Sequence, residues 1–278
     1  MPVPLDEYPI HQAPLSMAYM DTSDRNAYDR CYWNAHDRSG ELFLVTGLGV
    51  YPNLGVIDAY ATVRKGHHQH TIRMSDTLGE DRMKQEVGPY RIEVIEPLQK
   101  LRIICDGDDH GVGFDLTWEG SFPVVDEARH TWRRNGRINL DAQRFAQVGT
   151  WEGSLRVDGA EIEVSPDTWV GTRDRSWGIR GVGEAEPPGR AGDEPLEGFW
   201  WTYIPMRFED FALIVILQEE ADGTRVMNDV SRVFPASSGR APEQLGWPEV
   251  EIRYASGTRI PTGGTLYFQT RGRKELRL

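Results

Sequence analysis

The chain has 278 residues, which is enough for one large or two medium domains with a sizeable hydrophobic core. Hydrophobic residues make up 39% and charged residues 27%, as in soluble globular proteins, and no apolar run approaches the roughly 18 residues that a membrane-spanning helix needs. The formal net charge of −12 argues against binding to nucleic acid or to anionic membranes, because both favour a basic surface.

The first half shows period-two patterns broken by Gly, Pro, Asn and Asp, which is typical of antiparallel sheets. We expect strands over residues 42–50, 56–64, 68–74, 90–95, 98–105 and 111–118. This run of hairpins predicts an up-and-down barrel or a strongly curled sheet. Gly47 and Gly49 lie inside the first of these strands, where glycines usually mark a kink or bulge.

The middle of the chain is harder to assign. Residues 122–147 are polar and irregular, and they predict a short helix or a lid-like loop. A further hairpin is expected over residues 153–164, turning at Asp158-Gly159. Residues 181–195 are rich in Gly, Pro and acidic residues, so they indicate a linker, with a long surface loop within one domain as the alternative.

We therefore expect an all-β protein with two domains, residues 1–182 and 195–278. In the second domain, strands are expected over residues 199–206, 211–218, 224–233, 250–255 and 265–270. These are fewer than the about eight strands that close a small barrel, so we expect this domain to be incomplete or to be an open sheet packed on the first domain. An exposed sheet edge would follow, and homo-oligomerisation is one way to cover it.

The most unusual segment is residues 171–180, Gly-Thr-Arg-Asp-Arg-Ser-Trp-Gly-Ile-Arg. It fits either a buried Arg–Asp cluster at a domain junction or a polar patch beside a ligand pocket. In an extended strand Asp174 and Ser176 share one face, and Arg173, Arg175 and Trp177 share the other. The flanking guanidiniums predict a lowered pKa for the carboxyl of Asp174, which would make it an anchor and a poor general acid.

Other candidate sites are weaker. His67, His68 and His70 resemble a metal site, but they adjoin the predicted turn at Lys65-Gly66, and a solvated hairpin explains them more simply. Cys31 and Cys105 lack Cys-x-x-Cys spacing, and we expect them to be core residues. The sequence holds no nucleophile elbow, Walker loop or dinucleotide fingerprint, so we expect no metal and no cofactor. The first residues lack the pattern of a secretory signal, which predicts a cytoplasmic location.

Two segments carry a family resemblance: Asp174-Arg-Ser-Trp-Gly178, and the sequence from Phe199 to Asp210 followed by Asp222-Gly223. They resemble the carotenoid 1,2-hydratase (hydroxyneurosporene synthase) and AttH-like superfamily, in an uncharacterised branch. The resemblance implies two lipocalin-like β-barrel domains in tandem, with an apolar cavity near their interface. It also implies hydration or cyclisation of an isoprenoid, steroid or lipid-like molecule. Where the hydratase motif has Glu, this chain has Ser176, so that proton donor is missing.

Three functions stay open: a cofactor-independent hydratase, lyase or cyclase, a carrier of a lipophilic ligand, and an interaction protein. For the enzyme, the candidate catalytic residue is Asp174. The expected substrate-binding residues lie in the same motif and in the aromatic strand after the linker: Arg173, Arg175, Ser176, Trp177, Arg180, Trp200, Trp201 and Tyr203. The expected partner is a hydrophobic small molecule, with neither nucleic acid nor a membrane span.

Overall fold

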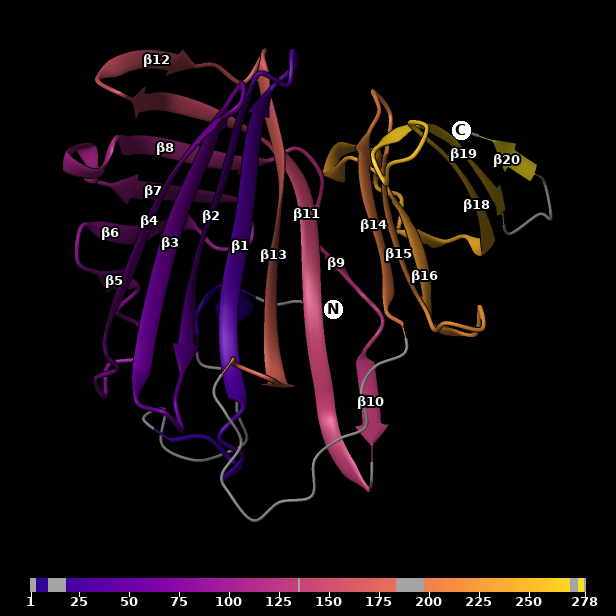
Figure 1. The fold of residues 1–278 in the computed structure, drawn as a ribbon, viewed down its shortest axis with the longest axis horizontal. Coiled ribbons are helices and arrows are strands. Elements are labelled where there is room, and N and C mark those ends of the chain that lie inside the picture. The colour runs from indigo at the N-terminus through magenta and orange to yellow at the C-terminus, as the bar shows by residue number, and fades with distance from the viewer. Residues whose placement is uncertain (1–3, 10–18, 135, 184–197, 271–274, 278) are drawn as a thin grey trace. The chain divides into compact units, whose positions relative to one another are not determined.

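A computed structural model describes residues 4–9, 19–134, 136–183, 198–270 and 275–277 (Figure 1). The chain divides into two compact units, Met1–Asp193 and Glu194–Leu278. Most of the predicted linker lies outside the described residues. Among those residues the only helices are the 3-10 segments η1 (Pro4–Glu7), η2 (Asp108–His110) and η3 (Ala236–Ser238). No helix in this part of the chain is long and apolar enough to cross a membrane.

The first unit is one antiparallel sheet that curls into a nearly closed barrel. Its strands are β1 (Ala27–Asp37), β2 (Leu42–Tyr51), β3 (Val56–Lys65), β4 (His68–Thr77), β5 (Glu86–Val87), β6 (Tyr90–Glu96), β7 (Lys100–Cys105), β8 (Val112–Gly120), β9 (Val125–Asp126), β10 (His130–Arg134), β11 (Arg137–Val157), β12 (Ala160–Val164) and β13 (Trp169–Arg180). The order is β4-β3-β2-β1-β13-β11-β8-β7-β6-β5, and β9, β10 and β12 pair with β11. The curl of the sheet brings β5, at one end of the strand order, into contact with β3 and β4 near the other end.

The barrel interior is a packed core. Along β3 the residues alternate, so that Ile57, Ala59, Ala61 and Val63 are buried while the residues between them are half-buried. Side chains from β1, β2, β7, β8 and β11 complete this core, including the fully buried Trp33, Trp118 and Trp151. An interior filled in this way fits a small barrel.

Two parts of this unit differ from the sequence-based expectation. Residues 122–147 hold neither a helix nor a lid-like loop, because they form β9, β10 and the first part of the 21-residue β11. That expectation was wrong because Ile138, Leu140 and Ala142 alternate with polar residues, which is the pattern of a strand. The register through Gly47 and Gly49 is continuous on both sides of β2, so these glycines do not mark a bulge.

The second unit contains two smaller antiparallel sheets. One has the order β14 (Trp200–Arg207), β15 (Ala212–Glu219), β16 (Arg225–Val233), β17 (Glu243–Gln244), and the other has β18 (Gly246–Tyr254), β19 (Pro261–Gln269), β20 (Glu275–Arg277). Residues of both sheets share one core, which includes Leu213, Val215, Val230, Leu266 and Phe268. The fold is therefore all-β and lipocalin-like, with a nearly closed barrel followed by additional sheets.

Candidate active site

The candidate site lies on the outer face of the barrel sheet, where five strands place polar side chains in two neighbouring rows. Strand register defines each row. One row runs across β3, β2, β1, β13 and β11 through Asp58, Gly49, Arg30, Ser176 and Arg144. The next row runs through Tyr60, Gly47, Tyr32, Asp174 and Ala146. Because successive residues of a strand alternate between faces, all of these residues face away from the packed core.

Glycines in β2 open a hollow in the middle of both rows. A Cβ at Gly49 would lie 2.9 Å from the Tyr51 hydroxyl and 3.0 Å from Oδ1 of Asp58. A Cβ at Gly47 would lie 2.4 Å from the backbone oxygen of Cys31 and 3.2 Å from the Tyr60 hydroxyl. Side chains from the neighbouring strands can approach the sheet here only because β2 has no side chain at either position.

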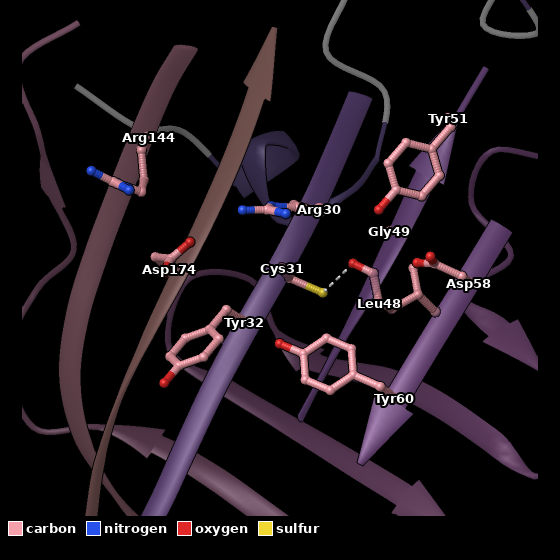
Figure 2. Close-up of a pocket in the computed structure, with 10 residues that line it drawn as sticks. All are labelled: Arg30, Cys31, Tyr32, Leu48, Gly49, Tyr51, Asp58, Tyr60, Arg144 and Asp174. Atoms are coloured by element: carbon pink, nitrogen blue, oxygen red, sulfur yellow. Dashed lines mark hydrogen bonds between the residues drawn. The ribbon is translucent and has the colours of Figure 1, made fainter. Parts of the chain in front are cut away.

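The hollow is a cavity of about 230 Å³. Its lining comes from β1, β2, β3, β11 and β13 and comprises Arg30, Cys31, Tyr32, Leu48, Gly49, Tyr51, Asp58, Tyr60, Arg144 and Asp174. Figure 2 shows Asp174 and Arg144 on one side of Arg30, with Tyr51, Asp58 and Tyr60 on the other. Two carboxyls, two guanidiniums and three phenols therefore surround a single small space.

Asp174 is the most reactive group that this cavity offers. Its carboxyl makes no hydrogen bond or ion pair with any described residue. Burial raises the pKa of Asp174 above the ordinary carboxyl value, and the nearby Arg144, Arg30 and Arg175 offset this only in part. The lowered pKa expected from the sequence is therefore wrong. The cause is geometric, because Arg173 and Arg175 point to the opposite face of β13 and pair with other groups there.

A second carboxyl, Asp58, lies in the neighbouring row. Burial raises its pKa, against the lowering effects of Arg30 and of hydrogen bonds from the Tyr51 hydroxyl and the Gly49 N–H. Arg30, the Tyr51 hydroxyl and the Gly49 N–H thus offset the effect of burial on Asp58 in part. The cavity combines two carboxyls whose pKa values are raised by burial.

The phenols of the cavity stay protonated. Burial raises the pKa of Tyr60, and the neighbouring Tyr32 adds to this effect. Burial also raises the pKa of Tyr32, although a hydrogen bond from Asn34 lowers it. The Tyr60 hydroxyl makes no hydrogen bond within the described part of the chain, so it can donate to a ligand oxygen. Cys31 is not a candidate nucleophile, because burial raises the pKa of its thiol to about 12.

The inner face of the same strands holds a separate polar network around Arg173 and Arg175. Nη1 of Arg173 lies 2.7 Å from Oε2 of Glu7, and Nε donates to Gln147 at 2.7 Å. Arg175 donates to Asp29 at 3.2 Å and to Gln85 at 2.7 Å. Both arginines are 1% exposed, and neither lines the cavity of Asp174.

The remaining predicted site residues are more widely placed. Ser176 is buried and hydrogen-bonds to Tyr28, and Trp177 packs edge-on against Phe145. Arg180 is exposed, and its backbone N–H donates to Asn26. Trp200, Trp201 and Tyr203 belong to β14 of the second unit, where Trp200 is exposed and Trp201 stacks on Phe199. Of the predicted set, only Asp174 lines the cavity.

Sequence reasoning missed most of the cavity residues. Arg30 and Tyr32 lie on β1, a strand that the hydrophobic pattern did not reveal. Asp58 and Tyr60 lie on a predicted strand at the positions between buried residues, so their outward direction was available from the alternation alone. The pair Gly47 and Gly49 was a second available signal, because two glycines on one face of a strand leave a gap in its surface.

The histidine group lies at the hairpin between β3 and β4. His68 is exposed, and Nε2 of His70 lies 3.1 Å from Asp158. Within the described residues, no three His, Cys, Asp or Glu side chains are grouped as metal ligands would be.

The fold is similar to that of several solved structures. One is kievitone hydratase from Nectria haematococca (TM-score 0.54, 14% identity, covering 97% of this chain and 83% of that one). Another is a putative AttH from Nitrosomonas europaea (0.56, 11%, 90% and 90%). A third similar structure is CghA with Sch210972 (0.57, 12%, 91% and 75%). The chain thus has the fold of the AttH and carotenoid-hydratase-like lipocalin superfamily, which confirms the resemblance at the level of fold.

Within this class the chain belongs to a particular family. Residues 3–278 match the model of a family of unknown function, DUF8625. A comparison with curated proteins finds no match.

Proposed function

We propose that this protein is an acid–base enzyme of the hydratase, lyase or cyclase type, with Asp174 as its proton donor. The observation that carries the proposal is a cavity-facing carboxyl with a raised pKa and no partner among the described residues. A carboxyl of this kind keeps its proton to a higher pH than an ordinary one, as a general acid needs. The presence of a hydratase among the structures of similar fold supports the same type of reaction.

The proposed step is the hydration of an alkene. Asp174 transfers its proton to one alkene carbon, and the π electrons form the new C–H bond and leave a cation on the other carbon. Tyrosine ring faces stabilise that cation. Water then adds to the cation, and a carboxylate of the cavity, Asp58 or the ionised Asp174, accepts the proton that the water loses. The sum is alkene plus water giving alcohol, and capture by an internal nucleophile instead of water gives cyclisation.

The lining also indicates what the substrate carries. Ring faces of Tyr32, Tyr51 and Tyr60 suit an apolar body, while the guanidinium of Arg30 and the Tyr60 hydroxyl suit an oxygen. We propose a hydrophobic molecule with an oxygen function near its double bond, in the isoprenoid, steroid or lipid-like range. A cavity of about 230 Å³ would enclose the reacting part of such a molecule.

The test begins with the molecule that the protein retains. Native mass spectrometry of freshly purified protein identifies a co-purified hydrophobic ligand, which is then incubated with the wild type and with Asp174→Asn. A panel of prenylated phenols and sterols is assayed in parallel. We expect the wild type to add or remove the mass of one water, or to return a cyclised isomer. Loss of the general acid should slow this conversion by about 100-fold or more.

The matched control is Asp109→Asn, which removes an exposed carboxyl on η2 that does not line the cavity. This variant should convert the ligand at the wild-type rate. Conversion by a folded Asp174→Asn protein at the rate of the Asp109→Asn control would contradict the proposed role. A ligand that binds tightly and is returned unchanged by the wild type would make the protein a carrier.

A further inference from the structure

A second polar site lies on the inner side of the first unit, centred on Arg82. This residue precedes β5 and is 2% exposed. Its three guanidinium nitrogens are all buried, and none has a hydrogen-bond partner in the described part of the chain. An arginine side chain keeps its charge in proteins, and a buried charge without hydrogen bonds is strongly disfavoured. This guanidinium therefore needs a partner of opposite charge.

The surroundings of Arg82 contain a second guanidinium that is only partly paired. Asp29 interacts electrostatically with Arg82, and it also accepts a hydrogen bond from Arg175 at 3.2 Å. Nε of Arg175 is buried without a hydrogen bond, and the nearest oxygen of Glu7 lies 3.9 Å away. Arg82 and Arg175 thus both interact with Asp29, Arg175 also lies near Glu7, and both guanidiniums retain unused N–H donors.

Arg173 shows how this region pairs an arginine with an anion, although its Nη2 is also buried without a hydrogen bond. Its Nη1 lies within 2.8 Å of both oxygens of Glu7, and its Nε donates to Gln147. The acceptors used across the network are carboxylate and amide oxygens, which match the planar fork of a guanidinium. A carboxylate is accordingly the anion whose shape suits the free donors of Arg82.

We propose that Arg82, supported by Arg175, binds the carboxylate of a small organic acid inside the first unit. This site differs from the cavity of Asp174, because the two lie on opposite faces of the same sheet. The bound carboxylate would accept hydrogen bonds from Arg82 and balance its charge, which Asp29 does not neutralise fully because Asp29 also pairs with Arg175. The inference does not depend on the proposed reaction.

The test uses acetate as the probe and the full chain as the protein. Thermal unfolding is followed in sodium acetate and in sodium chloride of equal ionic strength, above the pKa of acetic acid. A ligand that binds the folded state raises the unfolding midpoint by mass action. We expect acetate to raise the midpoint of the wild type more than chloride does, and Arg82→Met to lose this difference. Lys84→Met, which removes an exposed charge two residues away, should keep it.

A second measurement keeps the proposal testable if Arg82→Met does not fold. Arg82→Lys retains the charge but loses the planar fork, so titration of 13C-labelled acetate followed by NMR should show at least about tenfold weaker binding than in the wild type. Equal acetate binding by folded Arg82→Met or Arg82→Lys and by the wild type would overturn the proposal. Absence of any acetate effect on the wild type beyond that of chloride would also overturn it.

Discussion

Asp174 and Arg175 are neighbours in the chain, yet their side chains lie in opposite environments. Because β13 is extended, Asp174 faces the outer cavity and Arg175 faces Asp29 and Gln85 inside. The guanidinium of Arg175 therefore lowers the pKa of Asp174 only slightly, and burial, the larger effect, raises that pKa. Proximity in sequence was a poor guide to electrostatic pairing here. Strand alternation was the better guide, and the sequence contained it.

The stability of the protein should depend on the protonation of Asp174. Because its pKa is raised in the folded state, the protonated Asp174 carboxyl contributes fully to stability below the ordinary carboxyl pKa. This contribution is lost as pH rises through the raised value. Asp174→Asn cannot ionise, so the variant does not lose stability in this way. We expect its free energy of unfolding, measured by urea denaturation, to increase relative to that of the wild type as pH rises over this range. A constant difference between the two proteins at all pH values would contradict the assignment.

Gly49 sets the space available in the cavity. In Gly49→Ala the new Cβ would meet the Tyr51 hydroxyl at 2.9 Å and Asp58 at 3.0 Å, so both side chains must shift. We expect a stability loss of about 1–2 kcal/mol and much weaker ligand binding, measured by denaturation and by quenching of tryptophan fluorescence. Gly79→Ala is the control, because no atom lies within 4 Å of its Cβ position and it should leave binding unchanged.

At the scale of elements, β1 shows why part of the site could not be predicted. A half-buried strand is found by alternating apolar residues, but on β1 the inward positions include Asp29, which is fully buried and pairs with Arg175 on β13. A charged residue at a core position removes the apolar signal, and only the partner strand explains it. Arg30 and Tyr32 were therefore not predicted as site residues, although β2, β3 and the hairpin between β11 and β12 were predicted.

The buried carboxylate of Glu7 ties the short helix η1 to the barrel. Glu7 is fully buried, and its carboxylate contacts Arg173 and the N–H of Leu98. Burial on its own raises the pKa of Glu7, but Arg173, Arg175 and the hydrogen bonds together hold it below the ordinary value. The stability that the pair contributes is thus complete above the ordinary glutamate pKa and is lost as pH falls through the lowered one.

Glu7→Gln should destabilise the protein strongly. It leaves the buried guanidinium of Arg173 without its carboxylate, which typically costs about 3–5 kcal/mol. The matched change is Glu86→Gln in the exposed pair with Lys84, where a loss below about 1 kcal/mol is expected. Chemical denaturation near neutral pH compares the two variants. Equal losses for Glu7→Gln and Glu86→Gln would show that the η1 contact does not hold the barrel.

For the whole molecule, the sequence predicted the all-β class and most strands, because apolar alternation and turn residues are local signals. It did not predict the cavity, because register brings Tyr60, Tyr32 and Asp174 together from three distant segments. Long-range register is set by packing of the entire barrel and cannot be derived from one strand at a time. The linker and the two short motifs supplied the two-domain and superfamily expectations.

The first unit should fold without the second. The core cluster around Trp33 and Trp118 and the ion pair between Arg173 and Glu7 are all internal to it. We expect a fragment of residues 1–193 to show a β-type circular dichroism spectrum and a single cooperative unfolding transition. A fragment with no cooperative transition would mean that this core needs residues beyond 193.

The titration of Asp174 decides whether this residue can be the proton donor of the cavity. In protein labelled with 13C at the aspartate side-chain carboxyl, the signal absent from Asp174→Asn is assigned to Asp174 and followed against pH. We predict that its midpoint lies clearly above the ordinary aspartate value of about 3.9. A midpoint at or below that value would contradict the account, because Asp174 would then be an ionised anchor and not the proton donor of the cavity.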